Sequence, residues 1–295
     1  MRVAFIGFGL IAGSIARAVR SNPDTQGWTL AAWSPSGEGP MQALADGILD
    51  AAAPTPEAVL PGADLVVLAG PATACLADLD QLAGPWRALL PPESVVTDVA
   101  STKGMMIDRA DGAGLHFVGG HPMAGRETTG YASADAGLFR DRPWILVSGA
   151  HASAKDMARV ATLALACGAR IVEMDPIAHD RAVAAISHLP LIMAAALVEA
   201  MAGSGSADRP GSDDWEETAG LAAGAWRDVT RVARGDESMG AAIVATNAAA
   251  LAARLRDLRV VLDEWLAELE RPDGPDESAI AERLRAARLT LDRQR

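Results

Sequence analysis

The first nineteen residues restrict the possible folds most strongly. A short apolar run, Val3–Ile6, leads directly into Gly7-Phe-Gly9-Leu-Ile-Ala12-Gly13, and apolar residues recur with helical spacing over Leu10–Val19. This order of strand, glycine turn and helix is typical of the GxGxx(G/A) dinucleotide fingerprint. Gly7 permits a tight turn, Gly9 lets a pyrophosphate approach the backbone, and Ala12 or Gly13 permits close packing of helix on strand. The free N–H groups at the helix start then attract phosphate oxygens.

The same alternation of short β-rich runs with helical stretches continues to about residue 174. Seven strands are predicted, at Arg2–Ile6, Thr29–Trp33, Asp64–Ala69, Ser94–Asp98, His116–Val118, Trp144–Val147 and Arg170–Glu173. Helical spacing is found at Leu10–Val19, Met41–Ala45, Ala74–Leu82 and Ser153–Ala166. Apolar strands separated by helices predict an α/β Rossmann-type fold with a mainly parallel sheet covered on both faces.

The β-signal disappears after Met174. The remaining sequence predicts four helices, at His179–Met201, Trp215–Ala233, Met239–Glu270 and Ser278–Asp292. We therefore expect a dinucleotide-binding domain of residues 1–174, followed by an all-helical domain of residues 175–295.

The end of the second predicted strand bears on the choice between NAD and NADP. An acidic residue there would hydrogen-bond the 2′-hydroxyl of the adenosine ribose. This chain instead has Trp33-Ser34-Pro-Ser36-Gly37, with no carboxylate before Glu38 and no arginine beside the serines. Ser34 is compatible with a 2′-phosphate, so the sequence slightly favours NADP and leaves NAD(P)+ open.

Charge and cysteine content exclude several classes of protein. The chain has 26 basic and 38 acidic residues, a net charge of −12, which argues against nucleic-acid binding. The two cysteines, Cys75 and Cys167, cannot form a disulfide framework and indicate a reducing, cytoplasmic location.

The apolar stretch from Ala182 to Ala202 is long enough to span a bilayer, but His188, Pro190 and Glu199 interrupt it, so a buried helix is favoured over a membrane span. No spacing of ligands predicts a metal site.

Two further polar segments follow predicted strands. Asp98-Val-Ala-Ser101-Thr-Lys103 ends one strand and begins a helix, and His121 lies in a Gly/Pro-rich loop at the end of the next strand. Ligands of open α/β sheets bind outside the carboxyl ends of the strands, so Ser101 and His121 are expected beside a nicotinamide. A neutral histidine there is a candidate proton acceptor. On spacing alone, a histidine that only caps the loop is the alternative.

These segments together resemble the prephenate/arogenate dehydrogenase family of tyrosine biosynthesis. The resemblance spans nearly the whole chain. It rests on the glycine loop, Asp98-Val-Ala-Ser-Thr-Lys103, Gly120-His-Pro-Met-Ala-Gly125, Leu138-Phe-Arg-Asp-Arg-Pro-Trp144, His179-Asp-Arg-Ala-Val-Ala-Ala-Ile-Ser-His-Leu-Pro190 and Trp226-Arg-Asp-Val-Thr-Arg-Val-Ala233. The GHPMAG and HDR…SHLP segments are much more specific than a glycine loop.

The resemblance implies oxidative decarboxylation of prephenate or arogenate, with hydride transfer from ring C4 to NAD(P)+, and dimerisation through the helical domain. It makes His121 the catalytic histidine and Ser101 the serine that orients it. It implies a set of substrate-binding residues: Arg231 for the side-chain carboxylate, His188, and Glu127 on the pocket rim. Arg126 departs from the family, which has a small residue there, and adds a positive charge at the pocket mouth. The expected cofactor contacts are Gly7, Gly9, Leu10, Ile11, Ala12, Ser34 and Asp98. Gly240 stands where some members place a pocket tryptophan.

Two other functions are weighed against this one. A β-hydroxyacid dehydrogenase would resemble the chain in architecture but uses a lysine on the first interdomain helix, and His179–Met201 contains none. A non-catalytic NAD(P)-binding sensor would keep the glycine loop but has no need of His121, Ser101 and Arg231 together. Prephenate and arogenate remain undecided.

Overall fold

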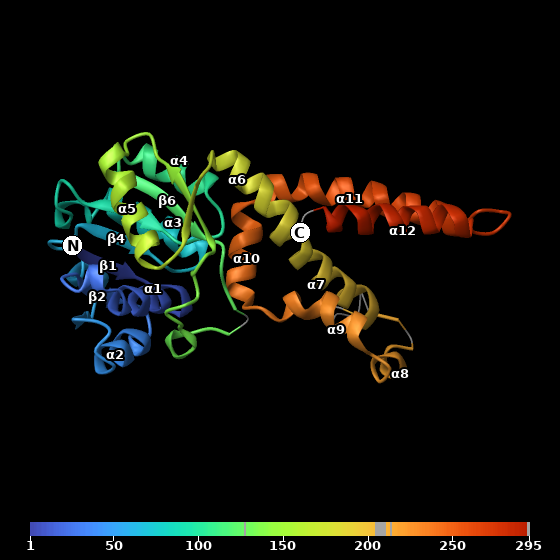
Figure 1. Cartoon of the computed structure of the whole chain (residues 1–295), viewed down its shortest axis with the longest axis horizontal. Coiled ribbons are helices and arrows are strands. Elements are labelled where there is room, and N and C mark those ends of the chain that lie inside the picture. Colours follow the sequence, from blue (N-terminus) through green and yellow to red (C-terminus); the bar gives the residue numbers. More distant parts are fainter. Residues whose placement is uncertain (127, 204–210, 213, 294–295) are drawn as a thin grey trace. The chain divides into compact units, whose positions relative to one another are not determined.

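The computed structural model describes residues 1–126, 128–203, 211–212 and 214–293. These residues form two compact units, Met1–Leu251 and Ala252–Arg295. The first unit holds the whole β-sheet and the helices that pack on it (Figure 1).

The sheet has eight strands in the order β3-β2-β1-β4-β5-β6-β7-β8 among the described residues. Their bounds are β1 Arg2–Ile6, β2 Thr29–Trp33, β3 Ala51–Ala52, β4 Leu65–Leu68, β5 Val95–Asp98, β6 Phe117–Pro122, β7 Pro143–Ser148 and β8 Arg170–Glu173. All neighbours run parallel except the antiparallel pair β6–β7. The predicted α/β fold with a mainly parallel sheet is confirmed. The two-residue β3 was not predicted, because two alanines carry almost no strand signal.

Helices cover both faces of this sheet (Figure 1). They are α1 Leu10–Ser21, α2 Glu38–Ala45, α3 Ala72–Ala83, α4 Gly104–Gly112 and α5 Ala154–Ala166. One apolar cluster joins α1 and α5 to one face, and a second joins α3 and α4 to the other. Strand residues alternate between the two clusters, as Val3 and Ala4 do on β1, which explains why the central strands are continuously apolar.

A long apolar helical segment follows the sheet. It comprises α6 Pro176–Val183, a π-helical turn η5 Ala184–His188, and α7 Leu189–Ala202. Asp175 caps the start of α6, where its carboxylate accepts N–H bonds from Ile177 and Ala178. The 27 residues from Pro176 to Ala202 are long and apolar enough to cross a membrane, and 22% of their apolar window is buried. Most side chains of α7 are only partly buried within this chain.

The remaining predicted helices are broken more often than expected. Trp215–Ala233 is divided into α8 Trp215–Ala219, α9 Gly224–Thr230 and the 3₁₀ turn η6 Arg231–Arg234. Met239–Glu270 is also wrong as a single helix, because α10 Glu237–Thr246 and α11 Ala248–Leu269 meet at Asn247 with a bend of 90°. Apolar spacing continues across both breaks, so the sequence pattern does not reveal them.

The second unit is a helical hairpin of the later part of α11 and of α12 Glu277–Asp292. Arg283 joins the two helices, with its guanidinium 3.0 Å from a Glu264 carboxylate oxygen and 4.3 Å from the centre of the Trp265 ring. The compact units therefore divide after Leu251, whereas the sequence predicted a domain boundary after Met174. Helices α6 and α10 pack on α4 and α3 of the first unit, which places them with the sheet.

Candidate active site

The glycine loop connects β1 to α1 at the point where the strand order reverses, between β1 and β4. Gly7 has φ of +87°, and its N–H donates to the Trp33 carbonyl at 2.9 Å. A Cβ on Gly7 would lie 2.7 Å from the Ala69 backbone, so no other residue fits this turn. Around Gly9, by contrast, a Cβ would meet no atom within 4 Å. The open space at this second glycine is where a pyrophosphate would have to approach.

The start of α1 also suits an anion. No side chain caps it, and no acidic residue lies in its first turn. Leu10 and Ile11 open the helix, and Ala12 is buried. Gly13 packs against a different element from the strand that the sequence analysis considered. A Cβ there would lie 2.7 Å from the Tyr131 ring, so this glycine makes room for the 3₁₀ turn η4 Tyr131–Ser133.

Ser34 directly follows β2, whose last residue pairs in register with the end of β1. Its side chain is buried, and its Oγ has no hydrogen-bond partner among the described residues. A buried hydroxyl without a partner is uncommon and costs free energy. A ribose hydroxyl or a phosphate oxygen of a bound dinucleotide would satisfy it.

Asp98, expected to contact the cofactor, is fully buried and pairs with the equally buried Lys103. Its carboxylate also accepts N–H bonds from Ala100 at 3.1 Å and from Gly120 at 3.0 Å. These bonds connect the ends of β5 and β6 immediately before His121. Within the described structure, the Asp98 side chain therefore supports the loops of the site and is not exposed to a ligand.

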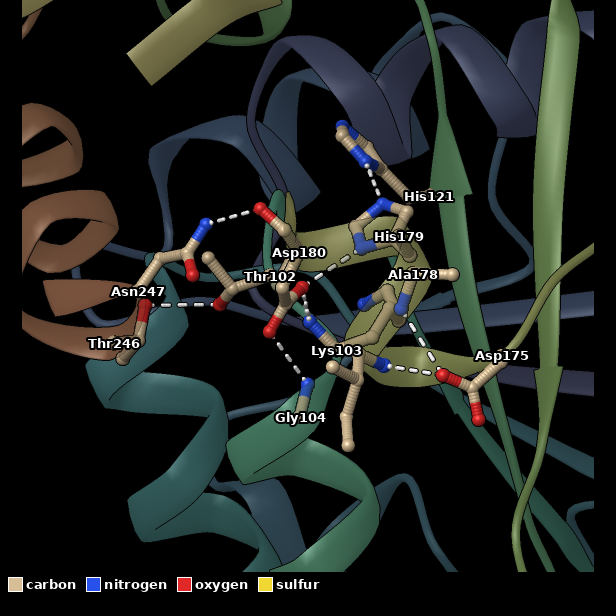
Figure 2. A network of polar contacts seen from close by, with 12 residues as sticks. Thr102, Lys103, Gly104, His121, Asp175, Ala178, His179, Asp180, Thr246 and Asn247 are labelled. Carbon is tan, nitrogen blue, oxygen red and sulfur yellow. Dashed lines mark hydrogen bonds and ion pairs between the residues drawn. The ribbon is translucent and has the colours of Figure 1, made fainter. Parts of the chain in front are cut away.

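His121 is the penultimate residue of β6, and about 9% of its surface is exposed. Its Nδ1 lies 2.8 Å from Nε2 of His179, which belongs to α6 (Figure 2). Burial lowers the pKa of His121 well below its usual range, and Lys103, His179 and His188 lower it further. His121 is thus a neutral imidazole at physiological pH, as a proton acceptor must be.

His179 is in turn held by its neighbour Asp180. The His179 Nδ1 atom is 2.8 Å from Asp180 Oδ1, and the same carboxylate accepts the backbone N–H groups of Lys103 and Gly104, each at 2.8 Å (Figure 2). Burial by itself would raise the pKa of Asp180, but these three hydrogen bonds outweigh it and lower the pKa. Asp180 is therefore an ionised carboxylate that joins α6 to the start of α4.

His188 lies in the π-helical turn, 1% exposed. Asn247 Nδ2 donates to the Asp180 carbonyl oxygen at 2.8 Å and lies 3.1 Å from His188 Nδ1. Because the carbonyl requires a donor, the amide orientation is determined, and His188 Nδ1 must accept. Burial lowers the pKa of His188 to about 4, so the ring is neutral and carries its proton on Nε2. That Nε2 atom is buried and has no partner among the described residues, which makes it a donor available to a ligand.

The other predicted site residues are placed as follows. Ser101 is half-buried in the β5–α4 loop, and no hydrogen bond connects it to His121 in the described part of the chain. Arg126 is exposed and paired with Asp135. Arg231 is exposed at the start of η6, which packs against α7. Glu127 lies outside the described residues.

Three polar residues of this site were not predicted as site residues: His179, Asp180 and Asn247. His179 and Asp180 open the HDR…SHLP segment, and their adjacency just before an apolar helix was the available signal. Asn247 belongs to none of the motifs found in the sequence, and a single amide within an apolar helical stretch does not by itself indicate a site. No group of three or more potential metal ligands occurs in the portion that the structure describes.

Both parts of the chain match models of known protein families. The family model for the nucleotide-binding domain of prephenate dehydrogenase matches residues 15–173, and the model for its dimerization domain matches residues 175–284.

Individual relatives extend over most of the chain. It is 32% identical over 272 residues to prephenate dehydrogenase of Bacillus subtilis, covering 91% of this chain and 68% of that protein. It is 31% identical to cyclohexadienyl dehydrogenase of Zymomonas mobilis, covering 91% and 86%. Its structure superposes on that of Synechocystis arogenate dehydrogenase with a TM-score of 0.77 at 28% identity, covering 99% of this chain and all of the other.

Proposed function

Because the chain belongs to the prephenate dehydrogenase family, we propose that it oxidises and decarboxylates prephenate or arogenate, with NAD(P)+ as the cofactor. The observation that carries the proposal is the buried, neutral His121 at the carboxyl end of β6, with its Nδ1 engaged and its other ring nitrogen left for a ligand. The curated relatives named prephenate and cyclohexadienyl dehydrogenase support the substrate class.

The residues around the β1–α1 turn fit a dinucleotide. Gly9 leaves room for the pyrophosphate, the uncapped start of α1 offers N–H groups to it, and Ser34 presents an unpartnered hydroxyl to the ribose end. The bound nicotinamide supplies the hydride acceptor. Gly7, Leu10, Ile11 and Ala12 complete the loop.

In the proposed reaction, His121 Nε2 accepts the proton of the C4 hydroxyl as hydride leaves C4. The ring then loses its C1 carboxylate as CO2, and the electron pair of that bond moves through the ring to the C4 oxygen. Proton return from His121 to this oxygen gives the phenol, so atoms and charge balance. General-base help of this kind supplies roughly 10²–10⁴-fold.

Substrate binding is assigned to residues from several elements. His188 donates through Nε2, and Arg231 binds the side-chain carboxylate, because a guanidinium stays charged and can pair bidentately. Ser101 lies on the loop after β5, where its hydroxyl would contact the substrate hydroxyl. Arg126 and Glu127 remain proposed members of the pocket rim. Positive charge near the pocket matters because the chain carries a net charge of −12 and the substrate is anionic.

We further propose that the protein is a cytoplasmic homodimer. The dimerization-domain match covers α6 to α11 and the first turns of α12, and α11 and α12 carry many exposed apolar side chains. Cys75 and Cys167 are both buried and unpaired, as expected in a reducing compartment. The domain boundary after residue 174 is retained as part of this proposal. Nothing in the acidic composition favours a nucleic-acid partner.

One set of measurements tests the proposed function. Initial rates are recorded with each of the four combinations of prephenate or arogenate with NAD+ or NADP+. Activity with at least one combination, with CO2 released in step with reduced cofactor, is the expected result. No turnover of either substrate with either cofactor would contradict the proposal. A β-hydroxyacid as control substrate should give no reduction.

A further inference from the structure

The structure contains a chain of polar contacts behind His121 that the proposed function does not use. It runs from Asp180 through His179 to His121, with two contacts of 2.8 Å each (Figure 2). His179 is 1% exposed, and its ring meets that of His121 edge-on, at 76° between the ring planes. Buried polar groups are costly unless each has a hydrogen-bond partner. Both ring nitrogens of His179 have one, and so does His121 Nδ1.

The direction of each hydrogen bond follows from Asp180. The ionised carboxylate can only accept, so His179 Nδ1 must carry a proton and donate it. The carboxylate already accepts two backbone N–H bonds, from Lys103 and Gly104, and is stabilised without a charged histidine. When this is the only proton on the His179 ring, its Nε2 is bare and accepts from Nδ1–H of His121. The proton of neutral His121 is thereby held on Nδ1.

We propose that His179 and Asp180 are positioning residues that hold the His121 proton on Nδ1 and leave Nε2 as the base. The inference rests on the proposed function, since it concerns the histidine assigned to proton transfer there. An isolated imidazole would divide its proton between the two nitrogens, and only one form has a lone pair on Nε2. The same chain stabilises the imidazolium formed after proton uptake, because His121 can then donate through His179 toward the Asp180 charge.

The test replaces the central residue in two ways. His179→Phe keeps an aromatic ring of similar size but removes both nitrogens, so His121 Nδ1 loses its acceptor. His179→Gln places an amide oxygen near the position of the original Nε2 and keeps that acceptor. His116→Phe is the matched control, because His116 also pairs with an aspartate, Asp156, at 3.1 Å, but in a half-exposed position on another part of the sheet domain.

Kinetics and NMR are both recorded. His179→Phe should lower kcat by at least about tenfold, within the roughly 10²–10⁴-fold that a general base supplies, while KM changes little. His179→Gln should recover most of kcat, and His116→Phe should match the wild type. Long-range ¹H–¹⁵N spectra of histidine-labelled protein, with His121 assigned from His121→Asn, should show a protonated Nδ1 and a bare Nε2 in wild type and His179→Gln. In His179→Phe, the two forms should mix.

Several results would overturn the inference. They are a wild-type kcat in His179→Phe, a His121 spectrum with the proton on Nε2 in the wild type, or equal losses of kcat in the Phe and Gln variants. If His179→Phe does not fold, the wild-type spectrum and His179→Gln still decide. If the wild type turns over neither substrate, the proposed function fails, whereas the NMR spectra still test the proton position.

Discussion

At the residue scale, the site combines two neutral histidines of opposite character. His121 offers a lone pair on Nε2, and His188 offers a proton on Nε2. Neither arrangement is intrinsic to histidine, since both depend on what the other ring nitrogen contacts. His179 accepts from one ring and Asn247 donates to the other, so two neighbouring imidazoles have different functions.

His121→Asn removes the proposed base while keeping a small polar side chain. We expect kcat to fall by roughly two to four decades, the range of lost general-base help, with folding and cofactor binding unchanged. Steady-state kinetics, thermal unfolding and titration with the reduced cofactor measure these quantities. A kcat near that of the wild type would remove His121 from the mechanism.

Arg231→Ala tests the carboxylate contact. Loss of a hydrogen bond to a charged group should weaken substrate binding by roughly 1.5–3 kcal/mol, seen mainly as a higher KM. Arg234→Ala, in the same 3₁₀ turn, is the control and should leave KM nearly unchanged. An unaltered KM in Arg231→Ala would contradict the assignment.

Ser34→Asp tests cofactor choice. The carboxylate would accept from the ribose 2′-hydroxyl of NAD+ and repel the 2′-phosphate of NADP+, so the ratio of kcat/KM values should shift toward NAD+ by about tenfold or more. We expect the wild type to accept NADP+, with weak discrimination. A wild type that rejects NADP+ altogether would mean that another acid, such as Glu38, reaches the ribose. Ser36→Asp serves as the comparison in the same loop.

At the element scale, the end of α10 contributes two polar residues, Thr246 and Asn247, to the contacts behind the site. Asn247 lies at the 90° bend, and its amide contacts both α6, through the Asp180 carbonyl, and the π-helical turn, through His188. The adjacent Thr246 hydroxyl contacts Thr102 Oγ1 at 2.8 Å, which joins the end of α10 to the loop after β5 (Figure 2).

Asn247→Ala should therefore destabilise the protein. It leaves His188 Nδ1 without a donor in a buried place and removes the second donor of the Asp180 carbonyl, which the Ala184 N–H also contacts. The expected cost is about 1–3 kcal/mol in the free energy of unfolding. Urea titration measures the loss. Thr290→Ala, which removes an exposed hydroxyl that bonds within α12, should change the value by less than about 0.5 kcal/mol. Equal stabilities of the Asn247 variant and the wild type would show that the bend does not depend on this amide.

At the scale of the whole molecule, exposed apolar side chains are concentrated on the helical part of the chain. The hairpin unit alone exposes Val260, Val261, Leu262, Leu266, Leu269, Leu284, Leu289 and Leu291 by 42% or more. Exposed apolar side chains in this number are typical of an interface. The dimerization-domain match over residues 175–284 agrees with that interpretation.

The double variant Leu262→Asp/Leu266→Asp tests the dimer. Buried carboxylates without partners would oppose association, so sedimentation velocity should show a shift from dimer to monomer. Leu165→Asp is the control, because Leu165 is equally exposed on α5 of the sheet unit, at 59%, and should leave the dimer intact. A wild-type protein that sediments as a monomer would overturn the dimer proposal.

The sequence by itself determined the elements whose signals are local. The order of strands and helices and the turn at Gly7 follow from short-range spacing and backbone restrictions. The strand before His121 was predicted to end at Val118, but β6 continues to Pro122 and includes His121, because its pairing with β7 extends it. Tertiary structure alone decided the breaks in the helical region, the burial of Asp98 against Lys103, and the contacts that give His121 and His188 their proton positions. The physical reason is that a hydrogen bond between His121 and His179, 58 positions apart, depends on how α6 packs on the sheet domain, which no local pattern records.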